Sequence, residues 1–319
     1  MRATNLTVLG IAKESAFGTP AAATNFIPVS PPTPKDVVKL VQDKGLRGSM
    51  VEEFNEYKTV QHSTFDFGGD LYPDTIGFIL AGVLGDVTTT GASAPYTHAI
   101  SVYNSTDGQP PSYTLTDNYG VNTRQYPGAK FSDIDIKFTG DGLITYTAKA
   151  VALPSVTTTA PTPSYSAVTP FAAYTGTVTI GSSAMNLVDG NVTIKRSVSV
   201  VDTVDGTAAP YALWSGPVSV SGKLTLVMEA ESQLTDYLAA NQNVLDVTWA
   251  AGSGAAATQL KLHMTNVVYQ AADITRGKDY VEIGVTFNAR GNSTDAGTSG
   301  GYSPIKATLQ NALASGTYK

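Results

Sequence analysis

Apolar and polar residues alternate along the stretch from residue 130 to residue 150. One face of this extended chain is apolar and the other is charged: Ile134, Ile136 and Phe138 against Asp133, Asp135 and Lys137. A period of two residues is typical of a strand with one buried and one solvated face. Residues 139–142 read Thr-Gly-Asp-Gly, and an Asp-Gly pair between two alternating runs is a strong hairpin signal. The pattern therefore predicts a long β-hairpin with a charged outer face.

A strand followed by a short helix is predicted earlier in the chain. Phe65 and Phe67 share one face of residues 63–71, as expected for a strand. From Pro73 to about Leu84 the apolar residues have helical spacing, and proline is well tolerated in the first turn of a helix.

The second half of the chain repeats this order of elements. Residues 218–224 match the strand at 65–71, and residues 231–240 match the helix, with Leu234, Tyr237 and Leu238 as its apolar positions. The other matches keep the same order: 245–250 with 113–118, 260–269 with 129–138, and 280–290 with 143–150. Identity between the halves is low, but the same succession of strand, helix, strand and hairpin predicts an internal duplication.

Composition changes suggest five segments. Residues 1–36 are rich in Ala, Thr and Pro, and we expect an irregular arm without a core of its own. Residues 37–153 form a first module, and residues 171–290 form a second. Between them, residues 154–170 contain four prolines among Thr and Ser, which is typical of an extended linker. Residues 291–319 form a tail that is flexible as far as Gly301, with a short helix from Ser303 to about Ala314.

The bulk composition restricts the classes of protein. The 319 residues contain 14% charged residues, carry a formal net charge of −6 and include no cysteine. A negative chain argues against sequence-specific nucleic-acid binding, which requires a basic surface. The first residues lack the apolar core of a signal peptide, and no apolar run reaches membrane-spanning length. We therefore expect no membrane association.

Candidate chemistry is sparse. His62, His98 and His263 lie far apart without a ligand at metal-site spacing, so we interpret them as strand or loop surface residues. Asp133 and Asp135 could form a carboxylate pair, but the neighbouring Lys137 favours a solvated strand face. Nucleotide-binding and hydrolase motifs are missing from the sequence. We expect no enzyme activity, no metal and no cofactor.

Several stretches, taken in order, resemble phage tail tube proteins of long, non-contractile tails. They are Gly10-Ile11-Ala12-Lys13-Glu14-Ser15-Ala16-Phe17-Gly18-Thr19-Pro20, Gly45-Leu46-Arg47-Gly48, Phe65-Asp66-Phe67-Gly68-Gly69-Asp70-Leu71 and Arg124-Gln125-Tyr126-Pro127-Gly128-Ala129-Lys130. Each motif is weak alone, and the likeness lies in their order over most of the chain.

The resemblance implies a mainly β fold of two tandem β-sandwich or half-barrel modules, each with a flanking helix and a long hairpin. Copies close into rings, and their inner strands complete a β-barrel around a lumen through which double-stranded DNA passes without specific binding. With two modules in each chain, three chains make a pseudo-hexameric ring; the alternative is six chains, with the second module outside. Rings stack into the tail tube of the virion, and the protein itself is made in the host cytoplasm. Other partners are the tape measure and terminator proteins.

Two sets of site residues follow from this expectation. The lumen-facing set is Asp133, Asp135, Lys137 and Glu282, and the arm set that contacts other subunits or rings is Phe17, Phe26 and Ile27. An acidic lining repels phosphate and lets DNA slide, whereas basic contacts bind it tightly.

Three other classes compete with this interpretation. A capsid decoration or receptor-binding domain would bind through exposed loops and would not polymerise. A carbohydrate-active β-sandwich would use Asp133 in catalysis. An outer-membrane barrel would need a signal peptide and aromatic girdles, neither of which the sequence shows.

Overall fold

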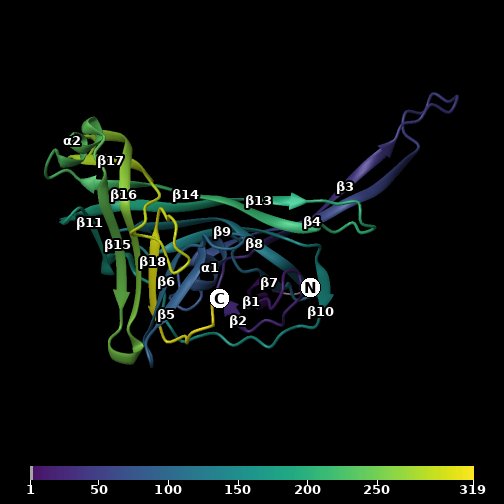
Figure 1. Cartoon of the computed structure of the whole chain (residues 1–319), viewed down its shortest axis with the longest axis horizontal. Helices are drawn as coiled ribbons and strands as arrows, with labels where there is room; N and C mark the ends of the chain where they lie inside the picture. The colour runs from purple at the N-terminus through teal and green to yellow at the C-terminus, as the bar shows by residue number, and fades with distance from the viewer. Residues whose placement is uncertain (1–2) are drawn as a thin grey trace.

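The computed structural model describes residues 3–319 and is mainly β, with eighteen strands and two α-helices in that range. In the first half the strands are β1 (Val8–Lys13), β2 (Asn25–Ile27), β3 (Thr33–Asp43), β4 (Asn55–Asp70), β5 (Gly85–Thr90), β6 (Tyr96–Val102), β7 (Tyr113–Asn118), β8 (Thr123–Thr139), β9 (Thr145–Ala152) and β10 (Val156–Thr158). In the second half they are β11 (Gly176–Ile180), β12 (Ser183–Met185), β13 (Leu187–Val201), β14 (Ala212–Val227), β15 (Asn243–Ala251), β16 (Thr258–Thr275), β17 (Glu282–Ala289) and β18 (Lys306–Asn311). The helices are α1 (Ile76–Leu84) and α2 (Ser232–Ala239). Figure 1 shows the long strands β4, β13 and β14 above the short strands β1, β2 and β7.

The predicted hairpin is confirmed. Strands β8 and β9 pair antiparallel from Lys130 opposite Val151 to Lys137 opposite Thr145. The apolar face is fully enclosed, since Ile134 and Ile136 have no exposed surface. The alternation in the sequence therefore separates core from solvent as expected.

The helices predicted near residues 73–84 and 231–240 both exist, but they differ in burial. Every residue of α1 is buried, and a Cβ on Gly77 or Gly82 would lie 2.3 Å from the Tyr318 ring or 2.2 Å from the Phe131 ring. These glycines therefore allow aromatic rings to approach the helix closely. Helix α2 covers its apolar positions less completely, since Leu234 packs against the core whereas Leu238 is 75% exposed.

The two halves share one pattern of strand pairing. In the first half β1 pairs with β2 and β7, β4 with β3 and β9, and β8 with β7 and β9. In the second half β11 pairs with β12 and β15, β14 with β13 and β17, and β16 with β15 and β17. The pairing of β8 with β13 then joins the halves side by side in one open sheet.

The N-terminal segment differs from the irregular arm that the composition predicted. Within residues 3–36, β1 pairs with both β2 and β7, and Leu9 and Ile11 are buried in the core. Residues 1–2 of the predicted arm lie outside the described part of the chain. The prediction from composition was wrong because the six-residue strand β1 pairs with the edge of β7, and this pairing is enough to bury the segment.

The C-terminal segment also differs from its prediction. Instead of a helix, residues 306–311 form β18, which pairs with β6 of the first half and β16 of the second. The segment before it is held by hydrogen bonds, including those of the Asp86 carboxylate with the Ser299 amide and the Thr298 hydroxyl. A tail that bridges both halves depends on contacts distant in sequence, which local composition does not show.

The linker and residues 33–70 contain further structure that the sequence did not predict. Strand β10 lies within the proline-rich linker and pairs with β8. Strand β4 begins eight residues before the strand predicted at 63–71, and it forms with β3 a hairpin whose tip projects from the molecule (Figure 1).

Two motifs from separate parts of the sequence meet at the Glu14 carboxylate. One oxygen accepts hydrogen bonds from the Gly128 amide at 2.7 Å and the Thr114 hydroxyl at 2.8 Å. The other accepts from the Ser112 hydroxyl at 2.7 Å and the Gly18 amide at 2.9 Å. Gly18 has a φ of 74° and Gly128 has a φ of 67°, so the turns that present these amides favour glycine. Glu14 thus fastens β1 to the start of the long hairpin.

Replacing Glu14 with Gln should lower the free energy of unfolding by about 3 kcal/mol, because an amide group then faces donors inside the core. Chemical denaturation of the monomer measures this change. The matched control is Glu52→Gln, whose side chain is 81% exposed and whose ion pair with Lys44 is solvated. Equal stability of both variants would contradict the role of Glu14.

Candidate assembly surfaces

The solvated face of the long strands carries charges in rows across the sheet. Direct cross-strand neighbours lie on the same face, and one such row runs through four strands: Asp66, Lys149, Asp133 and Lys195. Opposite charges directly across a strand pair are stabilising. The sign therefore alternates along this row from β4 to β13.

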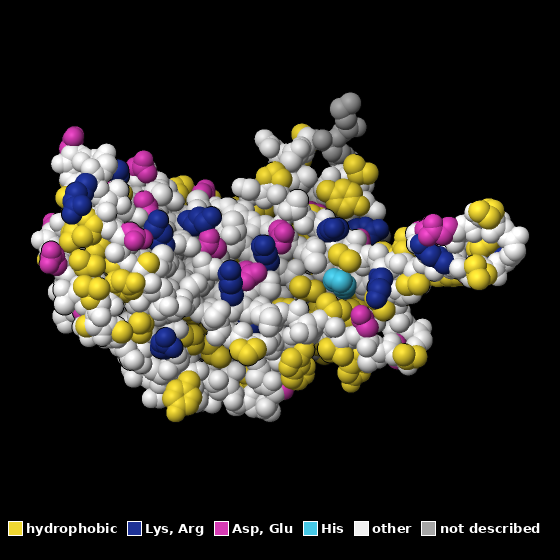
Figure 2. All heavy atoms as spheres, turned by 90° about the horizontal axis from the view of Figure 1, so that it is seen from above, with side chains coloured by type: hydrophobic (Ala, Val, Ile, Leu, Met, Phe, Trp, Pro, Cys, Tyr) yellow, Lys and Arg dark blue, Asp and Glu magenta, His cyan; other side chains and the backbone are white. Residues whose placement is uncertain are grey.

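This face is less acidic than the sequence suggested. Asp135 and Lys137 lie on it, as expected, and their charged groups are 3.4 Å apart. Lys223 adds a further positive charge opposite Asn191. Seen from above, the molecule shows basic and acidic side chains side by side, with no continuous patch of either sign (Figure 2).

Glu282 is the first residue of β17 and lies opposite Thr275 of β16. Its carboxylate accepts a hydrogen bond from the Lys278 ammonium at 2.8 Å. This contact lowers the pKa of the Glu282 carboxyl and keeps it ionised. Glu282 is therefore a paired charge and is separated in the sheet from the Asp133 row.

The β8–β13 junction has an apolar and a polar side. On the core side, Ile134 faces Ile194 and Ile136 faces Val192, and all four are fully buried. On the solvated side, one Asp135 oxygen accepts hydrogen bonds from the Thr193 hydroxyl at 2.6 Å and the Asn191 amide at 2.8 Å. The halves are thus joined as tightly as strands within a half.

Arg196 anchors the end of this junction from the core side. Its guanidinium donates to the carbonyl oxygens of Val83 at 2.9 Å, Gly108 at 2.6 Å and Gly216 at 2.7 Å. Burial lowers the pKa of Arg196 to about 10, so it remains charged at neutral pH. Because Val83 lies in the last turn of α1, Arg196 ties β13 to a helix of the other half.

The long strands run in the order β3-β4-β9-β8-β13-β14-β17-β16, and this run is open at both ends. The short strands β2, β5, β10 and β12 also pair on one side only in residues 3–319. Within the described residues, β3 pairs only with β4, and residues 268–275 of β16 pair only with β17. A free edge presents unpaired backbone N–H and C=O groups to any strand that can match it. These two edges are the natural sites of association.

The projecting β3–β4 hairpin carries exposed apolar side chains. Among them Leu46 and Met50 lie at the tip and are fully exposed, and Leu40 and Tyr57 are more than half exposed. An apolar projection of this kind is typical of a surface that another molecule covers.

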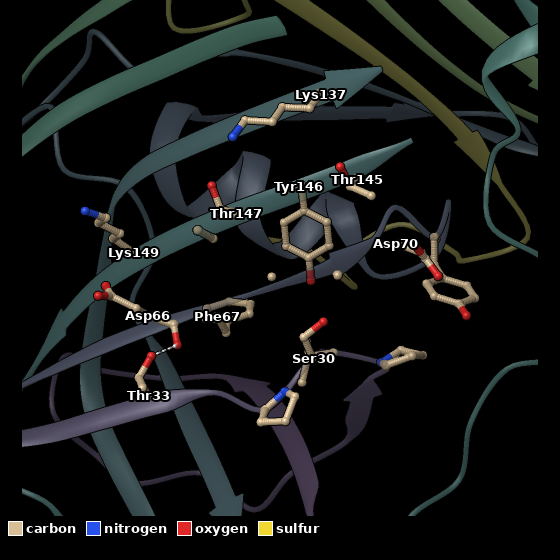
Figure 3. A pocket seen from close by; sticks show the side chains of 17 residues that line it. Ser30, Thr33, Asp66, Phe67, Asp70, Lys137, Thr145, Tyr146, Thr147 and Lys149 are labelled. Atoms are coloured by element: carbon tan, nitrogen blue, oxygen red, sulfur yellow. Dashed lines mark hydrogen bonds between the residues drawn. The ribbon is translucent and has the colours of Figure 1, made fainter. Parts of the chain in front are cut away.

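A hollow of about 780 Å³ lies between β4, β9 and the segment that leads into β3. Lys137 and Lys149 border it together with Asp66 and Asp70, and Ser30 lies on the opposite side (Figure 3). Its lining includes no histidine or cysteine and carries charges of both signs. The hollow is a feature of the polar face beside the β3 edge.

The proposed arm residues lie in different environments. Phe26 and Ile27 are buried in this chain's own core, whereas Phe17 is 40% exposed. Phe17 packs beside Gly128, with the Lys130 ammonium 6.0 Å from its ring centre. Of the three, Phe17 alone leaves much of its surface exposed to solvent.

The histidines were expected on the surface, which is wrong for His98. It is fully buried, within hydrogen-bond distance of Thr89 at 2.8 Å and Asn311 at 3.2 Å. His263 lies 2.5 Å from an oxygen of Asp246. In residues 3–319 no group of three or more His, Asp or Glu side chains is arranged to hold a metal ion.

None of the helices described is long and apolar enough to cross a membrane.

A family model described as phage tail tube protein matches residues 4–289 of the chain. The matched range includes both halves and the junction between them. A search of the curated proteins finds no match.

The variant Arg196→Met should lose about 3 kcal/mol or more of unfolding free energy, because buried carbonyl groups lose their donor. Thermal and denaturant unfolding of the purified monomer measure the loss. Lys195→Met on the exposed side of the same strand is the control and should be close to wild type. If the two variants are equally stable, Arg196 does not anchor the junction.

Proposed function

Because the chain belongs to the phage tail tube protein family, we propose that it polymerises into stacked rings that form the tube for ejection of double-stranded DNA. Membership in the family implies a structural component of the virion tail. The polymer, its symmetry and its contact with DNA are the parts that we propose.

The observation that carries the proposal is the β8–β13 junction. It joins an edge of one half to an edge of the other, and the strand that corresponds to β8 in the second half is β16. The strand that corresponds to β13 in the first half is β3. One free edge of the sheet is thus β16, the counterpart of β8, and the other is β3, the counterpart of β13. Edges of these two kinds already pair with each other inside the chain. Head-to-tail contacts of this type form a closed ring when the rotation closes.

We further propose that the halves are tandem modules from a duplication, supported by their six shared strand pairings. Three chains then supply six modules to a pseudo-hexameric ring. The alternative ring has six chains, with one module of each in the wall and the other outside. The internal junction favours three chains because both modules already share one sheet.

In the proposed ring the solvated face of the long strands lines the lumen. Asp133, Asp135 and Lys137 then face DNA, and Glu282 lies on the same face of the second module. Tight binding of DNA requires many lysine or arginine contacts that release counterions. On this face lysines alternate with carboxylates, so phosphates meet attraction and repulsion in turn. We propose that this balance lets DNA pass without specific binding.

Stacking uses other surfaces. The projecting β3–β4 hairpin and Phe17 supply exposed apolar groups for contact with the next ring. The tape measure and terminator proteins are proposed partners at the lumen and the end of the tube. The chain is made in the host cytoplasm, and its role is structural, without enzyme activity.

Cryo-electron microscopy of tubes assembled from the purified chain tests the proposal. We expect rings of three chains with six similar modules, and a lumen wall that contains Asp133 and Lys137. Rings of six chains would favour the alternative arrangement. A chain that remains monomeric under all assembly conditions, or tubes with Asp133 on the outside, would contradict the proposal.

A further inference from the structure

Shifts in the pairing register occur at equivalent places in the two halves, and they allow the halves to be aligned residue by residue. Strand β8 shifts register between Phe131 and Asp133 in its pairing with β9, and β16 shifts between Tyr269 and Ala271 in its pairing with β17. Asp133 therefore corresponds to Ala271, and Asp135 to Asp273. This alignment corrects the sequence match of 129–138 with 260–269, which differs from it by seven residues.

The strands on the other side of the junction align in the same way. The shift in β13 lies between Arg196 and Val198, and the shift in β3 lies between Val38 and Leu40. Arg196 therefore corresponds to Val38, and Thr193 to Lys35.

The internal junction predicts what the free edges should meet. Inside the chain, Asp135 lies opposite Thr193 and accepts its hydroxyl hydrogen bond. The corresponding residues on the free edges are Asp273 and Lys35, which have opposite charges. Both are exposed, and neither makes an ion pair or side-chain hydrogen bond with any residue from 3 to 319.

We infer that β16 of one copy pairs antiparallel with β3 of a second copy, in the register of the β8–β13 junction. The register places Asp273 opposite Lys35, Ala271 opposite Val37 and Thr275 opposite Thr33 of the neighbour. This inference rests on the proposed ring and names the contact that closes it. The cross-strand pair of opposite charges fixes the register, since a slip by one residue moves the two groups to opposite faces.

An independent observation at the helices supports the same contact. Both α1 and α2 end at a residue with positive φ, Gly85 at 94° and Ala240 at 52°, so Val83 corresponds to Leu238. Inside the chain, Arg196 of β13 reaches the Val83 carbonyl.

The same contact between copies joins two apolar side chains. Val38 takes the place of Arg196, and Leu238 takes the place of Val83. In the single chain, Val38 is 43% exposed and Leu238 is 75% exposed. The proposed pairing places these two together, which removes apolar surface from water. It also explains why α2 leaves an apolar side chain uncovered where α1 leaves none.

Disulfide crosslinking tests the register, because the chain has no cysteine of its own. The variant Ala271→Cys with Val37→Cys places one thiol on each edge, directly opposite across the proposed contact. Opposed residues in antiparallel strands have Cα atoms about 4.5–5.5 Å apart, which suits a disulfide. Oxidised tubes should yield crosslinked dimers and closed trimers on a non-reducing gel.

The matched control is Ala271→Cys with Thr33→Cys, which shifts one thiol by four residues, or about 13 Å along β3. This control should crosslink only at background level. Tubes in which the control crosslinks and the designed pair does not would overturn the register while leaving the ring intact.

Charge reversal gives a second reading if the cysteine variants fold poorly. Lys35→Asp and Asp273→Lys should each reduce the assembled fraction measured by sedimentation, and the double variant should restore it. No restoration, or a map of wild-type tubes with Asp273 far from Lys35, would overturn the inference. Failure of the wild-type chain to form any ring would instead overturn the proposed function.

Discussion

The constraint on which the structure depends is the hydrogen bonding of exposed strand edges. Backbone N–H and C=O groups at an open edge need a partner, and an unprotected edge invites other chains. Inside this chain the constraint is met where β8 pairs with β13 and the two halves become one sheet, and also where β18 joins β6 to β16. At the ends, β3 and residues 268–275 of β16 leave it unmet within the described residues. A closed ring would pair β3 of one copy with β16 of the next, in a contact of the same kind as the β8–β13 pairing inside the chain.

The sequence predicted the elements whose signal is local. The alternation around Ile134 and Ile136 gave the hairpin, and the order of elements in the second half anticipated the recurrence of strand pairings. The predicted polar face was also correct for Asp135 and Lys137, because period-two alternation fixes which side chains share a face.

Other features depend on partners distant in sequence. Composition could not show that β1 adds to β7 or that β18 bridges β6 and β16, since each strand is short and lacks a strong pattern. Glycines in α1 make room for the Phe131 and Tyr318 rings, a contact that the spacing of apolar residues in the helix does not show. The free edges of the candidate assembly surface were equally hidden, because strand order is a property of the sheet and of no single segment.

Protection of backbone amides at the two edges tests the central claim most directly. Hydrogen–deuterium exchange, measured by mass spectrometry on the monomer and on assembled tubes, follows residues 33–38 and 268–275 separately. The account predicts that both segments exchange rapidly in the monomer and become strongly protected together in tubes, while β8 and β13 are protected in both states. Tubes in which the two edge segments still exchange as rapidly as in the monomer would contradict it.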